Sequence, residues 1–211
     1  MQNATLRIIR KSSFKPSPWK NGGGVTHEAI RVPAEDPFRW RVSVAHIDAS
    51  GPFSDFAAYN RKMVLLQGGG IELRFADGNR KTLQEVGDLV EFDGGSAAYC
   101  ELTRGPCVDL NLMVSKSDGV AVRVERVIEP LAFNAPYDET MLIFGIEHRV
   151  TLAIDARNAA QRGNAGQRVT LEPWDLAVLS DCGGHLESCE PRAASASASV
   201  FLATLKFVRG E

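Results

Sequence analysis

Residues 38–47, FRWRVSVAHI, alternate strictly between two kinds of side chain. Every second position from Phe38 to His46 is bulky, whereas the positions between them include the smaller Ser43 and Ala45. An alternation with a period of two predicts a β-strand whose two faces are packed differently. This pattern limits the fold more than any other feature, because it recurs along the chain without a comparable helical period.

Similar apolar or alternating runs are separated by turn sequences such as Gly68-Gly69-Gly70 and Asp93-Gly94-Gly95. The one candidate helix is a short turn near residues 53–59. We therefore predict an all-β chain. The further predicted strands are 61–67, 70–76, 88–92, 97–102, 108–114, 121–128, 140–146, 149–155, 167–171, 175–179, 184–189 and 199–208.

The sequence also looks duplicated. Residues 81–95 and 168–184 share a Thr-Leu pair, an Asp-Leu pair, a short apolar strand and a closing Gly-Gly. A strand beginning at Met63 corresponds in order to one beginning at Met141. Two copies of roughly 90 residues, each with several short strands, predict two jelly-roll β-barrels in tandem. The expected domains are residues 1–117 and 118–211.

Composition narrows the classes of partner and the compartment. The net charge is −2 and no cluster of five or more like charges occurs, so neither nucleic acid nor a membrane surface is expected as a partner. The N-terminal apolar stretch is too short for a signal peptide, and no run is long enough to span a bilayer. We expect a cytoplasmic protein. Its four cysteines are expected to be free and mostly buried thiols: Cys100, Cys107, Cys182 and Cys189.

The chain matches the known sequence patterns of metal sites and catalytic nucleophiles only weakly. The two C-x6-C spacings match no common zinc pattern, and the four histidines show no H-x-H or H-x3-H spacing. No G-x-S-x-G elbow is present, and the glycine runs at 22–24 and 68–70 lack the Lys-Ser ending of a phosphate loop. We therefore expect no metal and no cofactor, and assign no catalytic residue.

Polar side chains occupy the less bulky faces of two predicted strands, with Arg41 and Ser43 on one and Asp109 and Asn111 on the other. Two such faces directed into one barrel would surround a void with a charged group, a hydroxyl and an amide. The alternative is that both are ordinary solvent-facing sides of a sandwich.

Arginine presents a planar fork that suits carboxylates, so Arg41 and Arg61 are candidates to bind an acidic ligand. Each arginine has a purely structural alternative, namely an ion pair. The candidate partners for that pair are Asp55, Asp109 and Glu28.

The segment WKNGGGVTHE, residues 19–28, concentrates several kinds of chemistry. An indole, an ammonium and an amide precede three consecutive glycines, which permit backbone conformations closed to other residues. Lys20 is equally well explained as a solvated surface lysine. The candidate ligand-binding residues of this segment are Trp19, Lys20, Asn21, Gly22, Thr26 and Glu28.

These motifs together resemble the HutD/Ves family. The resemblance rests on Pro18-Trp19-Lys20-Asn21-Gly22-Gly23-Gly24 with Thr26 and Glu28, on residues 38–47, and on Gly51-Pro52-Phe53-Ser54-x-Phe56 with Arg61. Gly87-Asp88 and Asp109-Leu110-Asn111-x-Met113 fit as well. It implies a bicupin, two cupin barrels in one chain, without the usual cupin metal ligands. It also implies a bacterial cytoplasmic protein linked to histidine utilisation, whereas Ves members in enteric bacteria are connected with cold and stress responses.

The favoured hypothesis is a metal-independent bicupin that binds a small anionic metabolite of histidine degradation, of the urocanate or formylglutamate class. Its role would be regulatory rather than catalytic. Arg41 and Arg61 would take the carboxylate, Ser43, Asn111 and Asn21 would add hydrogen bonds, and Trp19 would close one side.

Two alternatives stay open. One is an isomerase or hydrolase in which Glu28 or Asp109 acts as general base. The other is an interaction scaffold. The sequence leaves a homodimer open, and also a ligand in the second barrel.

Overall fold

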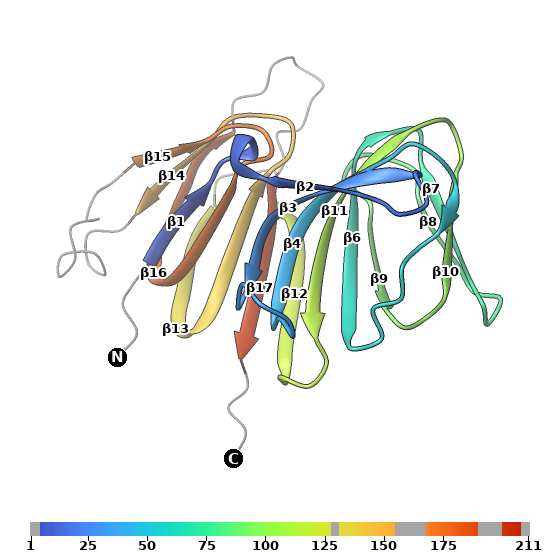
Figure 1. Cartoon of the computed structure of the whole chain (residues 1–211). Coiled ribbons are helices and arrows are strands. Elements are labelled where there is room, and N and C mark those ends of the chain that lie inside the picture. The colour runs from blue at the N-terminus through green and yellow to red at the C-terminus, as the bar shows by residue number, and fades with distance from the viewer. Residues whose placement is uncertain (1–4, 128–130, 155–167, 190–199, 208–211) are drawn as a thin grey trace. The chain divides into compact units, whose positions relative to one another are not determined.

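The computed structural model describes residues 5–127, 131–154, 168–189 and 200–207 (Figure 1). Within these ranges the regular structure is strand apart from one 3-10 turn, η1 (Lys11–Ser13), which confirms the predicted all-β class. The chain divides into two compact units: residues 14–118, the N-terminal unit, and residues 1–13 with 119–211, the C-terminal unit. This division differs from the expected 1–117 and 118–211 in its first residues, because β1 (Thr5–Ile9) pairs with a strand of the C-terminal unit.

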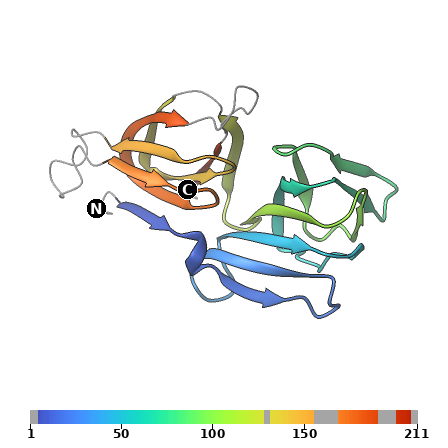
Figure 2. The same cartoon turned by 90° about the horizontal axis from the view of Figure 1, so that it is seen from above.

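The N-terminal unit is built from two sheets. The strand order is β2-β3-β4-β11-β6-β9 in the first and β5-β10-β7-β8 in the second. In Figure 2 the blue strands β2, β3 and β4 lie side by side in one layer. The strands are β2 (Lys15–Pro18), β3 (Gly24–Val32), β4 (Trp40–Ile47), β5 (Gly51–Pro52), β6 (Tyr59–Gly68), β7 (Ile71–Phe75), β8 (Arg80–Leu83), β9 (Leu89–Asp93), β10 (Ala98–Leu102) and β11 (Cys107–Ser115).

The core of the N-terminal unit is an apolar cluster drawn from both sheets. Ala45 and Met63 contribute from the first sheet, and Ile71, Leu73 and Cys100 contribute from the second. Alternate residues of β4, β6 and β11 therefore face this core, which defines the inner face of the first sheet.

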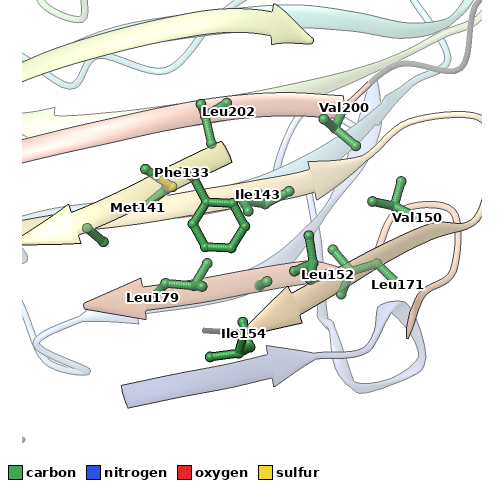
Figure 3. Packing of buried hydrophobic residues seen from close by; sticks show 12 residues of the cluster. Phe133, Met141, Ile143, Val150, Leu152, Ile154, Leu171, Leu179, Val200 and Leu202 are labelled. Atoms are coloured by element: carbon green, nitrogen blue, oxygen red, sulfur yellow. The ribbon is translucent and has the colours of Figure 1, made fainter. Parts of the chain in front are cut away.

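The described residues of the C-terminal unit form one sheet in the order β12-β17-β13-β16-β14-β15, with β1 added to β16. Its apolar side chains point toward one another from several strands (Figure 3). The strands are β1 (Thr5–Ile9), β12 (Val120–Val127), β13 (Leu131–Gly145), β14 (Val150–Ile154), β15 (Arg168–Leu171), β16 (Leu176–Cys189) and β17 (Val200–Phe207).

Three predicted details are wrong. No helix forms at 53–59, where β5 is followed by a turn. The runs 175–179 and 184–189 are one strand, β16, because a Gly-Gly pair can adopt extended backbone as readily as a turn. The strand predicted at 140–146 begins earlier, at Leu131.

The duplication is visible in individual hydrogen bonds. In each unit an aspartate carboxylate accepts from the backbone of a residue three positions earlier: Glu85 N donates to Asp88 Oδ2 at 3.0 Å, and Glu172 N donates to Asp175 Oδ2 at 3.0 Å. These two aspartates belong to the Asp-Leu pairs that the sequence comparison aligned, so that part of the alignment matches the structure.

The same turns correct the alignment of the preceding strands. The aspartate carbonyl oxygens accept from Leu65 N at 3.0 Å in one unit and from Gly145 N at 3.1 Å in the other. Leu65 lies two residues after Met63, whereas Gly145 lies four residues after Met141. The two strands therefore correspond with a shift of two residues from the expected match.

Candidate functional site

Three adjacent strands of the N-terminal unit place polar side chains on the inner face. Asn111 of β11 pairs with Ser43 of β4, and Asp109 pairs with Ala45 of β4 and Leu65 of β6. Because Ala45 and Leu65 belong to the apolar core, their polar neighbours share its face. The exposed fractions are 3% for Ser43, 1% for Asp109 and 6% for Asn111, so these are buried groups and not the solvent face of a sandwich.

Arg61 joins this face from β6, where it pairs with Met113 of β11 and is 6% exposed. Its Cζ lies 5.0 Å from the ring centroid of Phe53, 5.8 Å from that of Phe56 and 4.9 Å from that of Phe92. Cation–π attraction holds the guanidinium among these rings. Phe53 and Phe56 lie in the motif that singled out Arg61, but sequence reasoning assigned them no role, and it had no signal for Phe92.

The Arg61 guanidinium has no ion pair or hydrogen bond to the part of the chain that the structure describes, and its Nε is buried without an acceptor. Burial lowers the pKa of Arg61 to about 10, with Asp109 acting in the opposite direction and Arg41 in the same one. The side chain is therefore charged at neutral pH. A buried cation without a close partner is costly, and an anion is the group that would stabilise it.

Asp109 and Asn111 present oxygen atoms near this cation. Both Oδ1 atoms are buried without a donor among the described residues. Burial raises the pKa of Asp109 to about 7, against the attraction of Arg61. Burial also raises the pKa of the neighbouring Cys100 thiol to about 12, so this cysteine stays protonated and is a poor nucleophile.

Glu28 and Arg41 form the structural ion pair that the sequence left as an alternative. Arg41 Nε lies 2.7 Å from Glu28 Oε2 without hydrogen-bond geometry, and the two side chains are 13% and 19% exposed. Arg31 Nη2 donates to the same Oε2 at 2.8 Å. The Glu28 carboxylate is thus shared by two arginines; it offsets part of the charge of Arg41, whereas Arg61 has no ion pair among the described residues.

Trp19 is partly buried against the core, beside the rings that enclose Arg61. Its ring packs edge-on against Phe53 with a centroid distance of 6.0 Å, and its Nε1 donates to Thr26 Oγ1 at 2.8 Å. The two residues support a wall of the arginine enclosure, with Trp19 in contact with Phe53 and Thr26 fixing the indole.

The glycine loop satisfies its own backbone groups. Gly22 N donates to Trp19 O at 3.0 Å, and Gly23 N donates to Asn21 Oδ1 at 3.0 Å. Lys20, Asn21 and Gly22 are exposed, so the structure does not bring them to the buried polar groups. A Cβ on Gly24 would lie 2.2 Å from His46 O, so close packing of β3 on β4 explains this glycine.

The histidines of β3 and β4 lie away from the inner face. His27 pairs with Val44, and the His27 and His46 ring centroids are 5.0 Å apart. Among the residues that the structure describes, no three His, Cys, Asp or Glu side chains come together as a metal-binding group. Cys100 and Cys107 are buried free thiols, as expected, whereas the side chains of Cys182 and Cys189 lie outside the described residues.

The internal duplication supplies a comparison for the polar groups. With Leu65 matched to Gly145, the strand registers identify the equivalent residues at every second position of the paired strands. Three of the buried polar side chains have apolar counterparts in the core of the C-terminal unit, drawn in Figure 3. The counterparts are Met141 for Arg61, Val200 for Asp109 and Leu202 for Asn111. The fold therefore does not require polar side chains at these positions.

Comparisons with known proteins agree with this architecture. A family model described as HutD matches residues 11–197. A HutD structure from Pseudomonas fluorescens SBW25, described as a formate condition, is 26% identical with a TM-score of 0.77 and covers 98% of this chain and 100% of its own. A cupin 2 conserved barrel domain protein from Leptotrichia buccalis, 11% identical with a TM-score of 0.55, covers 95% of this chain and 100% of its own and shows the shared fold.

Two curated relatives match a shorter region. An uncharacterized 21.2 kDa protein in the hutC 3' region of Pseudomonas putida is 41% identical over 110 residues, 51% of this chain. Protein Ves of Escherichia fergusonii is 35% identical over 97 residues, 45% of this chain. The alignments span 57% and 50% of the relatives' own lengths. In the described part of the chain, no helix has the length and apolar character needed to cross a membrane.

Proposed function

This chain belongs to the HutD family, a cupin family associated with histidine utilisation, and on that premise we propose that its N-terminal unit binds a small anionic metabolite at Arg61. The ligand class is that of urocanate and formylglutamate, and the role is regulatory, in the cytoplasm. Arg61 takes the ligand carboxylate, and Ser43 and Asn111 add neutral hydrogen bonds. Arg41 contributes only the electrostatic attraction of its positive charge for the ligand, because its guanidinium is paired with Glu28.

The observation that carries this proposal is the contrast between the two copies. A buried cation and two buried polar oxygens without partners are expensive, each unsatisfied group costing on the order of 1–3 kcal/mol. The C-terminal unit fills the same three positions with Met141, Val200 and Leu202. Apolar side chains at these positions would build the same fold at a lower cost in free energy. We therefore attribute the polar groups of the N-terminal unit to ligand binding.

The decisive variant copies the C-terminal residues into the N-terminal unit as Arg61→Met, Asp109→Val and Asn111→Leu combined. We expect the variant to fold with equal or higher thermal stability, because replacing buried polar groups by apolar ones of similar size is neutral or stabilising. Calorimetric titration with urocanate and with N-formylglutamate should show binding by the wild type and none by the variant.

The matched control is Arg80→Gln, which removes one positive charge from an exposed site of the same unit. It should bind like the wild type. A triple variant that is folded and binds both compounds unchanged would reject the proposal. Absence of binding by the wild type itself would favour the interaction scaffold.

A second candidate function is catalysis with Asp109 as general acid or base. The observation that favours it is the pKa of Asp109, raised by burial to about 7, the range in which a group exchanges protons at neutral pH. Glu28 is less suited, because it is paired with Arg31 and Arg41. Conversion of urocanate or N-formylglutamate by purified wild type, lost in Asp109→Asn, would support catalysis over simple binding.

A further inference from the structure

The strand register gives the Asp109 carboxyl no hydrogen-bond donor on the neighbouring strands. Its neighbours on the inner face are Ala45 and Leu65, whose side chains donate no hydrogen bond. The carboxyl is 1% exposed, and Oδ1 has no donor among the described residues. An ionised carboxylate there leaves Oδ1 with neither water nor a donor, whereas a protonated carboxyl gains an O–H that can donate to a ligand.

The charges around Asp109 come from several strands. Arg41 is paired with Glu28, so Arg61 is the cation that acts on Asp109, and its positive charge would be shared between Asp109 and a bound anion. Two carboxylates beside one guanidinium repel each other unless one of them is protonated. The titratable and charged groups that face this region are Arg61 on β6, Arg41 on β4, Glu28 on β3, Cys100 on β10 and Cys107 on β11.

Resting on the anion site proposed above, we propose that the N-terminal unit binds its anion together with one proton, taken up from solvent by the Asp109 carboxyl. The ligand carboxylate pairs with Arg61, while the Asp109 O–H donates to a ligand oxygen instead of repelling it. The proton leaves the buffer and joins a carboxylate oxygen of Asp109, and no other covalent bond forms or breaks. The occupancy of the site therefore depends on pH as well as on ligand concentration.

The direction of the pH effect follows from the charges. The free carboxyl of Asp109 has a pKa of about 7, and an anion beside it raises that pKa further. Affinity is then highest below about pH 7 and falls as the pH rises above it, by at most about tenfold per pH unit for one proton. Arg61, with a pKa of about 10, stays charged over most of this range.

Calorimetric titration with N-formylglutamate in two buffers of different ionisation enthalpy counts the protons directly. Its two carboxyl groups are both ionised near neutral pH, so the ligand takes up no proton of its own. We expect uptake close to one proton per ligand at about pH 8 and little at about pH 5.5. Asp109→Asn, whose amide donates a hydrogen bond without titrating, should bind with no proton uptake and with a pH-independent affinity.

Asp109→Val, which carries the residue of the C-terminal copy, serves as a second variant and should bind more weakly, again without proton uptake. Wild-type binding with no proton uptake at about pH 8, or the same pH dependence in Asp109→Asn, would overturn the proton coupling and leave the anion site standing. Absence of wild-type binding at every pH, or undiminished binding by Arg61→Met, would instead reject the anion site.

Discussion

Arg61 and Asp109 illustrate how position rather than residue type decides what a side chain does. Both lie on the inner face, but Arg61 keeps its charge among three aromatic rings while burial pushes Asp109 toward its neutral form. Alternation in the sequence placed both residues on strands correctly and gave the face of Asp109, but it assigned no face to Arg61. It could not reveal that Glu28 lies against Arg41, because that contact depends on the register between β3 and β4.

The raised pKa of Asp109 predicts a pH dependence of protein stability opposite to that caused by most aspartates. Its pKa is about 7 in the folded protein and about 3.9 when unfolded, so the native state holds one extra proton between these values. Stability is therefore lost as the pH rises from about 4 to about 7, at up to about 1.4 kcal/mol per pH unit. The gain in stability of Asp109→Asn over the wild type should grow across this window and then level off.

Urea unfolding followed by tryptophan fluorescence at a series of pH values measures this difference, since Trp19 and Trp40 both lie in the N-terminal unit. The control is Asp55→Asn, which alters an exposed aspartate of the same unit. A constant difference between Asp109→Asn and the wild type from about pH 4 to about pH 8 would contradict the assignment.

At the scale of elements, the strands with clean alternation were predictable and the others were not. β4, β6 and β11 were predicted close to their observed bounds. β3 was missed because a bulge between Glu28 and Ile30 interrupts its pairing with β4 and the period of its side chains. Periodicity also carries no information on which Gly-Gly pair turns the chain and which, as in β16, continues a strand.

The glycine run before β3 gives a prediction at this scale. Gly24→Ala should destabilise the N-terminal unit by about 2–4 kcal/mol, because its Cβ would clash with a backbone oxygen of β4. Gly22→Ala is the matched control: its φ of +70° costs about 1 kcal/mol, and nothing lies within 4 Å of the added Cβ. Equal unfolding midpoints for both variants in urea would disprove the packing explanation for Gly24.

At the scale of the whole molecule, the twofold plan was predictable from repeated motifs, but the course of the N-terminal residues was not. β1 pairs with β16 over Thr5–Ile9, and the next two residues contact Asp175. Arg10 Nη1 lies 2.6 Å from Asp175 Oδ2, and Lys11 N donates to Oδ1 at 2.9 Å. Sequence patterns fix local strands, whereas a pairing between residues more than 160 positions apart leaves no local signature.

Asp175→Ala should loosen this attachment. Removing a 3%-exposed carboxylate that accepts from two backbone amides and Arg10 should cost about 2–3 kcal/mol in the C-terminal unit. Hydrogen exchange of the β1 amides should accelerate. Asp88→Ala, the counterpart in the N-terminal unit, should leave β1 exchange unchanged, and equal exchange in wild type and Asp175→Ala would refute the role given to Asp175.

The central claim is that a buried arginine in the N-terminal unit receives a small anion. A crystal structure of the protein with N-formylglutamate tests it most directly. The account predicts a ligand carboxylate within hydrogen-bond distance of the Arg61 guanidinium, on the face that carries Ser43, Asp109 and Asn111. A ligand bound elsewhere on the chain, with no contact to Arg61, would contradict it.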